Sequence, residues 1–280
     1  MNGQLKRYTA FTTEPSGGNP AGVWVGDHLP SAAEMQQMAA DVGYSETAFI
    51  APAQGAKRTV RYFSPEAEVP FCGHATIASG VVLGQLSGAG RYTFSTQAGD
   101  VGVQVQAQAD RYTAALTSVE PRSEPVSDAV LSQALQYLGW RADELDTAIL
   151  PRKAYAGAWH LVLAVAEKRR LDRLDYDFDA LKNLMLAEGL TTLQLVWRES
   201  DTQFHARNPF PVGGVVEDPA TGAAAAALGG YLRELGVLNP LPRQLTIHQG
   251  VAMGRPSVIR MDVNPVGGIV VSGTAVEIPG

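Results

Sequence analysis

The sequence has a single cysteine, no long apolar run and no cluster of basic residues. The lone Cys72 excludes an intrachain disulfide, which fits a reducing compartment. The most apolar helical run, residues 223–232, is far shorter than the roughly 20 residues that a membrane-spanning helix needs. Residues 1–7 lack the apolar core of a signal peptide. We therefore expect a cytoplasmic protein that does not bind membranes.

Positive charge is also scarce. The 22 Lys and Arg residues are outnumbered by 28 Asp and Glu residues, giving a formal net charge of -6. The densest charge run, residues 167–170, follows an apolar segment and precedes Asp-rich sequence, so it is interpreted as a solvated turn. Nucleic-acid binding needs clustered Lys and Arg against phosphates. We expect no nucleic-acid partner.

What the chain does have is an ordinary globular composition, with 45% hydrophobic and 18% charged residues among 280. This length fits two lobes of ordinary domain size. The polar, proline-containing segment 119–125 is the best linker. We therefore predict an N-terminal lobe over residues 1–120 and a C-terminal lobe over residues 126–280, and the last strand is allowed to pack back on the first lobe.

Strands and helices are expected from apolar periodicity and turn residues. Helices are expected at 31–42 and 127–138, capped by Ser31 and Ser127, and at 179–187. Two more helices are expected to end at Leu86 and at Leu235. The first follows a loop that begins at residue 70, and the second follows a loop at 208–220. Strands are expected at residues 5–12, 22–26, 46–51, 59–63, 91–95, 101–106, 112–116, 148–150, 160–165, 193–197, 202–207, 245–248, 258–263 and 269–278.

Two of these helices are apolar all round, and each begins at a glycine, Gly73 or Gly222. A helix without a polar face must be buried on all sides. The simplest architecture is an α+β fold in which a mainly antiparallel sheet wraps around a central helix, and this arrangement occurs twice. The first backbone N–H groups of a helix lack internal partners and can bind a carboxylate. The alternative is that both glycines only permit tight turns into packed helices.

Glu46 stands at the start of an apolar strand, where a carboxylate is unusual. Partial burial should raise its pKa toward neutrality, as suits a general acid and base. The alternative is a strand-end side chain that points to solvent.

Three further residues lie beside the helix starts. His74 can donate to a substrate or can be a capping or core histidine. Cys72 can be a secondary acid or base or a small buried residue. Asp218, held extended before Pro219, can contact a ligand or can cap a turn. The other histidines have no metal-ligand spacing to His74, so no metal is expected.

Several segments together resemble the PhzF-like (phenazine biosynthesis) family of the diaminopimelate-epimerase superfamily. They occur in the same order over nearly the whole chain. The matching segments are residues 11–12, 18–23 (GNPAGV), 45–49 (SETAF), 61–65 (RYFSP), 68–76 (EVPFCGHAT), 217–222 (EDPATG), 249–250 and 253–257 (MGRPS).

The resemblance implies a diaminopimelate-epimerase-like fold with two pseudo-symmetric lobes, each a barrel-like sheet around a buried helix. It also implies a cofactor-independent isomerase, which we expect to be a homodimer. The family's catalytic glutamate falls on Glu46, which would move a proton within a small cyclic amino or hydroxy carboxylic acid. In the phenazine member that acid is trans-2,3-dihydro-3-hydroxyanthranilate. The substrate-binding residues would be Asn19, Gly73, His74, Asp218, Gly222 and Ala223.

The sequence departs from the family pattern at two points. Many members have Ser where this chain has Ala223, so one hydroxyl donor is missing. Cys72 falls where diaminopimelate epimerase has one of two paired cysteines, and this chain has no second cysteine. Racemisation by two thiols is therefore excluded. One alternative function is an amino-acid epimerase or racemase of the same fold that uses Cys72 with Glu46, or Glu46 with Asp218, as its two bases. The other is a non-catalytic metabolite-binding protein.

Overall fold

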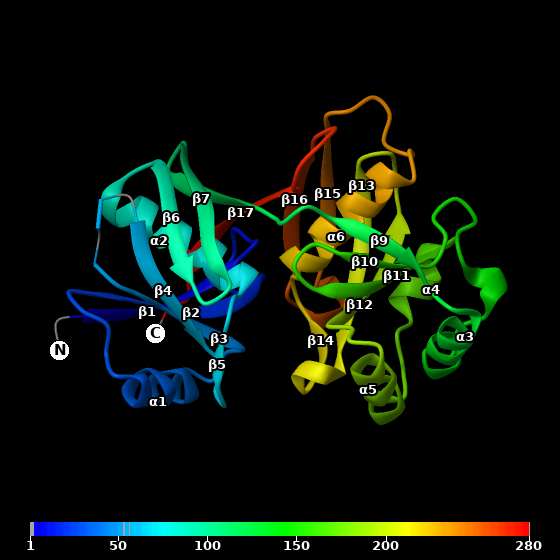
Figure 1. Ribbon diagram of the computed structural model, residues 1–280, viewed down its shortest axis with the longest axis horizontal. Coiled ribbons are helices and arrows are strands. Elements are labelled where there is room, and N and C mark those ends of the chain that lie inside the picture. The colour runs from blue at the N-terminus through cyan, green and yellow to red at the C-terminus, as the bar shows by residue number, and fades with distance from the viewer. Residues whose placement is uncertain (1–2, 53, 56, 280) are drawn as a thin grey trace. The chain divides into compact units, whose positions relative to one another are not determined.

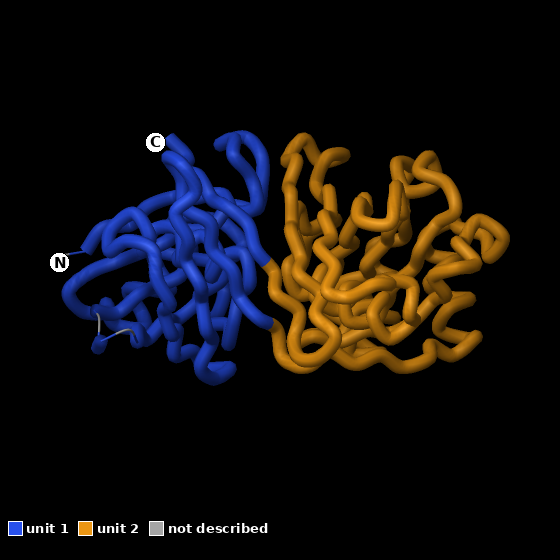
Figure 2. Tube along the Cα trace, turned by 90° about the horizontal axis from the view of Figure 1, so that it is seen from above, with its two compact units in different colours: residues 1–117, 272–280 blue, residues 118–271 orange. Residues whose placement is uncertain are grey.

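The computed structural model describes residues 3–52, 54–55 and 57–279, so Met1, Asn2 and Gly280, at the ends of the predicted lobes, lie outside the described residues. The chain divides into two compact units (Figures 1 and 2). Unit 1 comprises Met1–Thr117 and Ser272–Gly280, and unit 2 comprises Ser118–Val271.

Unit 1 is a closed, mainly antiparallel barrel. Its strands pair in the order β1–β2–β3–β4–β6–β7–β8–β17, and β17 pairs with β1 to close the ring. The pairs β2–β3 and β4–β6 are parallel. The strands are β1 (Gly3–Ala10), β2 (Asn19–Gly26), β3 (Glu46–Ile50), β4 (Lys57–Phe63), β5 (Glu68–Val69), β6 (Gly90–Thr96), β7 (Gly99–Gln108), β8 (Arg111–Thr117) and β17 (Val270–Glu277).

The interior of this barrel is filled by helix α2 (Gly73–Ser87), which contacts β1, β2, β3, β7 and β8 (Figure 1). Every residue from His74 to Gly84 is buried, as the absence of a polar face predicts. Small residues let the strands approach closely. A Cβ added at Gly80 would lie 2.7 Å from the Cβ of Ala114.

Unit 2 also wraps a mainly antiparallel sheet around a buried helix, α6 (Gly222–Glu234), which contacts β9, β10, β11, β12 and β16. Most of its strand pairs are antiparallel, whereas β11–β12 and β13–β15 are parallel. The strands are β9 (Arg122–Pro125), β10 (Arg152–Tyr155), β11 (Trp159–Val165), β12 (Thr192–Arg198), β13 (Gln203–Phe210), β14 (Val215–Asp218), β15 (Arg243–Gln249) and β16 (Ser257–Val263).

The remaining helices are not enclosed by the sheets as α2 and α6 are. Helix α1 packs Met35 and Ala39 against a small apolar cluster in unit 1, and α3 and α5 cover a larger cluster in unit 2. Ser31 and Ser127 accept hydrogen bonds from the backbone at Glu34 and Val130, as predicted for caps. These helices are α1 (Ala32–Val42), α3 (Asp128–Tyr137), α4 (Lys168–Asp172), α5 (Phe178–Ala187), η1 (Ala142–Glu144), η2 (Pro211–Gly213) and η3 (Val251–Met253).

Four local predictions were wrong. The segment predicted as a linker contains β9, whose register with β10 pairs Arg122 with Tyr155. The strand expected at 148–150 lies later, at β10, because residues 147–149 form a bend. The loop expected at 208–220 contains the end of β13 and all of β14. The charged run at 167–170 starts the short helix α4. Polar and proline-containing segments can form strands when neighbouring strands pair with them, which their composition alone does not predict.

The α+β class predicted from the sequence is confirmed. In the part of the chain that the structure describes, no helix has the length and apolarity required to cross a membrane.

Candidate active site

Glu46 is the first residue of β3, whose other four residues are buried. The parallel pairing of β2 and β3 places Ala21 opposite Glu46. Asn19 lies two residues before Ala21 on β2, so Asn19 and Glu46 occupy the same face of the sheet. Asn19 is 2% exposed, whereas the Glu46 side chain is 21% exposed. The strand thus holds the carboxylate at a rim that is still accessible to solvent.

Cys72 and His74 are brought to the same rim by the start of α2. Cys72 is the N-cap residue, with extended backbone and no capping bond from its side chain. His74 is the second residue of the helix, and both side chains are buried. Among the residues that the structure describes, and leaving aside its chain neighbours and the backbone of its own helix, no atom would lie within 4 Å of a Cβ added at Gly73, so there is open space beside the helix start.

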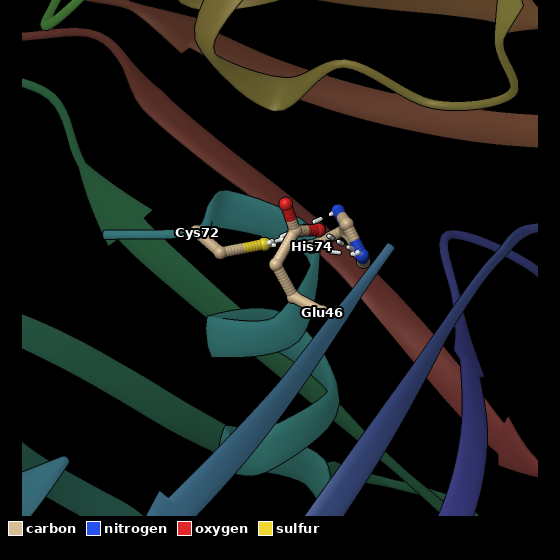
Figure 3. A group of neighbouring side chains, drawn as sticks. All are labelled: Glu46, Cys72 and His74. Carbon is tan, nitrogen blue, oxygen red and sulfur yellow. Dashed lines mark hydrogen bonds and ion pairs between the residues drawn. The ribbon is translucent and has the colours of Figure 1, made fainter. Parts of the chain in front are cut away.

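The three side chains converge, and we call Glu46, Cys72 and His74 the rim triad (Figure 3). The Cys72 thiol lies 3.4 Å from Oε2 of Glu46, to which it donates, and 3.4 Å from Nδ1 of His74. Nε2 of His74 lies 3.4 Å from the same Glu46 oxygen. Oγ of Ser45 is 3.3 Å from Nε2 of His74. A carboxylate, a thiol and an imidazole can therefore exchange protons with one another at one point.

Two buried hydroxyl groups fix the backbone beneath the rim triad. Thr76 donates from Oγ1 to the carbonyl oxygen of Cys72 over 2.7 Å, and the Tyr62 hydroxyl lies 2.7 Å from the same Oγ1. Burial raises the pKa of Tyr62, so its hydroxyl stays protonated. Sequence reasoning missed both residues. Tyr62 and Thr76 lie within matching segments, but their contact depends on how β4 packs against α2.

The other predicted site residues lie in unit 2, at the start of α6. Asp218 ends β14, and its Oδ2 accepts a hydrogen bond of 2.5 Å from Oγ1 of Thr221. Gln249 donates from Nε2 to the Asp218 carbonyl and to Thr221 Oγ1, and its Oε1 accepts from the Thr221 N–H. Gly222 and Ala223 are the first two helical residues and are half-buried.

The hydrogen bond from Thr221 is the kind of contact expected if Asp218 caps a turn, which was the alternative to ligand binding considered from the sequence. Sequence reasoning missed Gln249, which contacts Thr221 only through the pairing of distant strands. Glu217, the acidic residue directly before Asp218, is 6% exposed and forms an ion pair of 2.6 Å with Arg207. It is therefore committed to the fold.

Solved structures share this fold. A phenazine biosynthesis protein of the PhzF family from Bacillus anthracis superposes with a TM-score of 0.85 at 21% identity, covering 100% of this chain and 98% of its own. A hydroxyproline epimerase from Agrobacterium vitis gives a TM-score of 0.66 at 12% identity, covering 99% and 92%. The chain therefore has the same fold class as this PhzF protein and this hydroxyproline epimerase.

Sequence comparison narrows this class to one family. The family of phenazine biosynthesis-like proteins (PhzC-PhzF) matches residues 8–280. A protein of Escherichia coli strain K12, named uncharacterized isomerase YddE, is 32% identical over 289 residues, covering 99% of this chain and 96% of the relative. The Bacillus subtilis protein named uncharacterized isomerase YfhB is 29% identical, covering 98% and 96%. The chain belongs to the phenazine biosynthesis-like family and is an isomerase, which confirms the predicted family and enzyme class.

Proposed function

We propose that Glu46 moves a proton within a small cyclic amino or hydroxy carboxylic acid of the trans-2,3-dihydro-3-hydroxyanthranilate type. The substrate carboxylate binds at the N–H groups of the α2 start, beside Gly73. Asn19 and His74 in unit 1, and Asp218, Gly222 and Ala223 in unit 2, remain proposed substrate contacts. A homodimer and a cytoplasmic location remain predictions.

The observation that carries this proposal is the position of the Glu46 carboxylate, partly exposed and 3.4 Å from both Cys72 and His74. A general base must reach the proton that it removes, which requires some exposure. Neighbouring proton donors hold the carboxylate in one orientation. The helix start supplies unpaired donors and partial positive charge for a substrate anion without any Lys or Arg.

The proposed reaction balances without an oxidant or a reductant. The Glu46 carboxylate accepts a proton from one ring carbon, and the electron pair of the broken C–H bond forms a new double bond. The existing conjugated system shifts, and its far carbon takes the proton back from the Glu46 carboxylic acid. One residue both removes and returns the proton, so no second base is required.

The rim geometry favours this reaction over epimerisation by Glu46 and Cys72. Inversion by two bases requires them on opposite faces of one carbon, with each reacting atom about 3–3.5 Å from that carbon. The Sγ of Cys72 is only 3.4 Å from Oε2 of Glu46, which leaves no room for a carbon between them. The two groups therefore act from the same side.

The test is solvent exchange in D2O, with substrates that include the dihydro-hydroxyanthranilate and linear and cyclic amino acids. With the wild-type enzyme, we expect deuterium at the substrate carbon that receives a proton when the double bond migrates. Glu46→Gln should lower this rate by about 100-fold to 10,000-fold, because the amide cannot accept the proton. Mass spectrometry and NMR give the rate and the labelled position.

Glu68→Gln is the matched control, because its side chain is 20% exposed and also belongs to unit 1, but is ion-paired with Arg61. It should retain exchange. Label at an inverted stereocentre, with no migration, would instead establish an epimerase. Substrate binding with neither double-bond migration nor exchange in wild type would establish a metabolite-binding protein. Equal exchange rates in wild type and Glu46→Gln would show that Glu46 is not the base.

A further inference from the structure

The rim triad combines three side chains of the types that bind zinc. Zinc sites use cysteine thiolate, imidazole nitrogen and carboxylate oxygen as ligands. One ligand atom from each of Glu46, Cys72 and His74 lies within 4.8 Å of the other two. Sequence spacing predicted no metal, because that reasoning compared only the histidines with one another. Cys72 lies only two positions before His74, and the fold adds a glutamate 28 positions before His74.

The distances between the ligand atoms also suit zinc. Zn–S bonds of about 2.3 Å and Zn–N or Zn–O bonds of about 2.0–2.1 Å give edges of roughly 3.3–3.6 Å in a tetrahedron. The corresponding separations are 3.4 Å for Cys72 Sγ to Glu46 Oε2, 3.4 Å for Glu46 Oε2 to His74 Nε2, and 3.8 Å for Sγ to Nε2. Three corners of the tetrahedron are thus already close to their required separations.

We propose that the rim triad binds one Zn²⁺ ion per chain through Glu46 Oε2, Cys72 Sγ and one imidazole nitrogen of His74, and that this ion inhibits the isomerase reversibly. The Cys72 thiol releases its proton to solvent when the sulfur–zinc bond forms. A thiolate and a carboxylate then balance the charge of the cation, and a water molecule completes the tetrahedron. Hard cations such as Mg²⁺ prefer oxygen ligands and should not compete.

Inhibition rests on the proposed function, because zinc would occupy the Glu46 oxygen that is proposed to accept the substrate proton. Metal binding itself does not depend on that proposal. The two can therefore fail separately, provided that binding is measured without substrate.

Cobalt provides the most direct binding test. The full-length chain, kept reduced with a phosphine instead of a thiol, is titrated with Co²⁺ and the spectrum is recorded. We expect an ultraviolet thiolate-to-cobalt charge-transfer band and the intense visible bands of tetrahedral cobalt, saturating at one equivalent. Because Cys72 is the single cysteine of the sequence, a thiolate band can come from no other residue. Absence of this band would overturn the proposal, whatever the activity of the enzyme.

Calorimetry with Zn²⁺ alone then tests the ligands. Cys72→Ser should weaken binding by more than about tenfold, since even residues that only orient metal ligands contribute 10-fold to 100-fold. The matched control is His205→Gln. His205 Nε2 is 3.0 Å from Glu199, and the ring centroids of His205 and His248 are 5.2 Å apart, which makes this a competing place for zinc in unit 2. Unchanged affinity in Cys72→Ser with loss in His205→Gln would overturn the assignment.

The activity arm uses the exchange assay. Zn²⁺ should inhibit wild-type exchange at the concentrations that saturate the calorimetric site, a chelator should restore it, and Mg²⁺ should have no effect. Zinc that binds at Cys72 without inhibiting exchange would overturn the inhibitory role and count against Glu46 as the base. Exchange that persists in Glu46→Gln would overturn the proposed function and leave the metal site standing.

Discussion

The two buried helices begin in the same way but carry different polar groups at their starts. At α2, Glu46, Cys72 and His74 contact one another, and Cys72 forms no capping bond. At α6, Asp218 accepts from Thr221, and Gln249 binds both. One helix start therefore presents groups that can exchange protons with one another, whereas the other presents a carboxylate that accepts a hydrogen bond from a threonine hydroxyl. The same backbone device serves two kinds of chemistry, and the side chains decide which.

The largest expected difference is kinetic. Glu46→Gln should lower kcat by about 100-fold to 10,000-fold because it removes the proposed base. Asp218→Asn keeps an acceptor for Thr221 but loses the charge, so it should raise KM by about tenfold, the equivalent of one charged hydrogen bond, and change kcat little. Steady-state kinetics on both variants checks the contrast. A collapse of kcat in Asp218→Asn with an unchanged KM would place the base in unit 2.

The next difference concerns a buried histidine in unit 2. His160 is fully buried on β11, on the face opposite Leu161, and its Nδ1 is 2.8 Å from Thr192 Oγ1. Desolvation lowers the pKa of His160 from 6.5 to about 3. Between these values the unfolded chain binds a proton that the folded chain does not, so stability falls as pH falls from about 6.5 toward about 3.

Urea unfolding at pH 7.5 and pH 5 measures this effect. His160 should account for a loss of about 2 kcal/mol in the free energy of unfolding over that interval. His160→Gln should flatten the pH dependence, even if it lowers stability at both pH values. His28→Gln, at an exposed position, is the control and should leave the dependence as it is in wild type. An equal pH slope in wild type and His160→Gln would contradict the prediction.

Packing of the two helices should differ as well. A Cβ at Gly80 in α2 would lie 2.7 Å from Ala114 and 3.0 Å from Val103, whereas a Cβ at Gly229 in α6 would have its nearest neighbours at 3.3 Å. Gly80→Ala should cost about 1–3 kcal/mol through overpacking. At Gly229, the gain of up to about 1 kcal/mol from replacing a helical glycine offsets the milder crowding. Denaturant unfolding compares the variants, and equal costs would contradict the difference in packing.

The sequence predicted helices and strands better than it predicted contacts between side chains that are distant in the chain. The two apolar helices α2 and α6, and the serine caps of the outer helices α1 and α3, follow from local signals, and the structure contains all of them. The nearness of Cys72 to His74 follows from the chain itself. Their contact with Glu46 is not local, because it depends on the pairing of β2 with β3 and on the position of α2 inside the barrel. The family resemblance suggested the grouping, but the residues alone did not.

The misses have the same physical origin. Strands β9 and β14 contain proline or charged residues and acquire their structure from neighbouring strands, so a local pattern reads them as loop. The supporting contacts of Tyr62 with Thr76 and of Gln249 with Thr221 join residues that are 14 and 28 positions apart. No periodicity identifies such partners in advance.

The smallest expected difference tests whether the two helix starts differ in stability as well as in chemistry. Thr221→Val keeps the shape of the side chain but removes the hydroxyl that donates to Asp218 and accepts from Gln249. It should lower the free energy of unfolding by about 1 kcal/mol, because partly buried polar groups lose a partner. Cys72→Ser replaces a thiol that caps nothing with a hydroxyl that can still donate to Glu46, so its cost should stay within about 0.5 kcal/mol. Equal costs in urea unfolding would show that the α2 start is as firmly tied as the α6 start, and that the rim triad is built for stability instead of proton exchange.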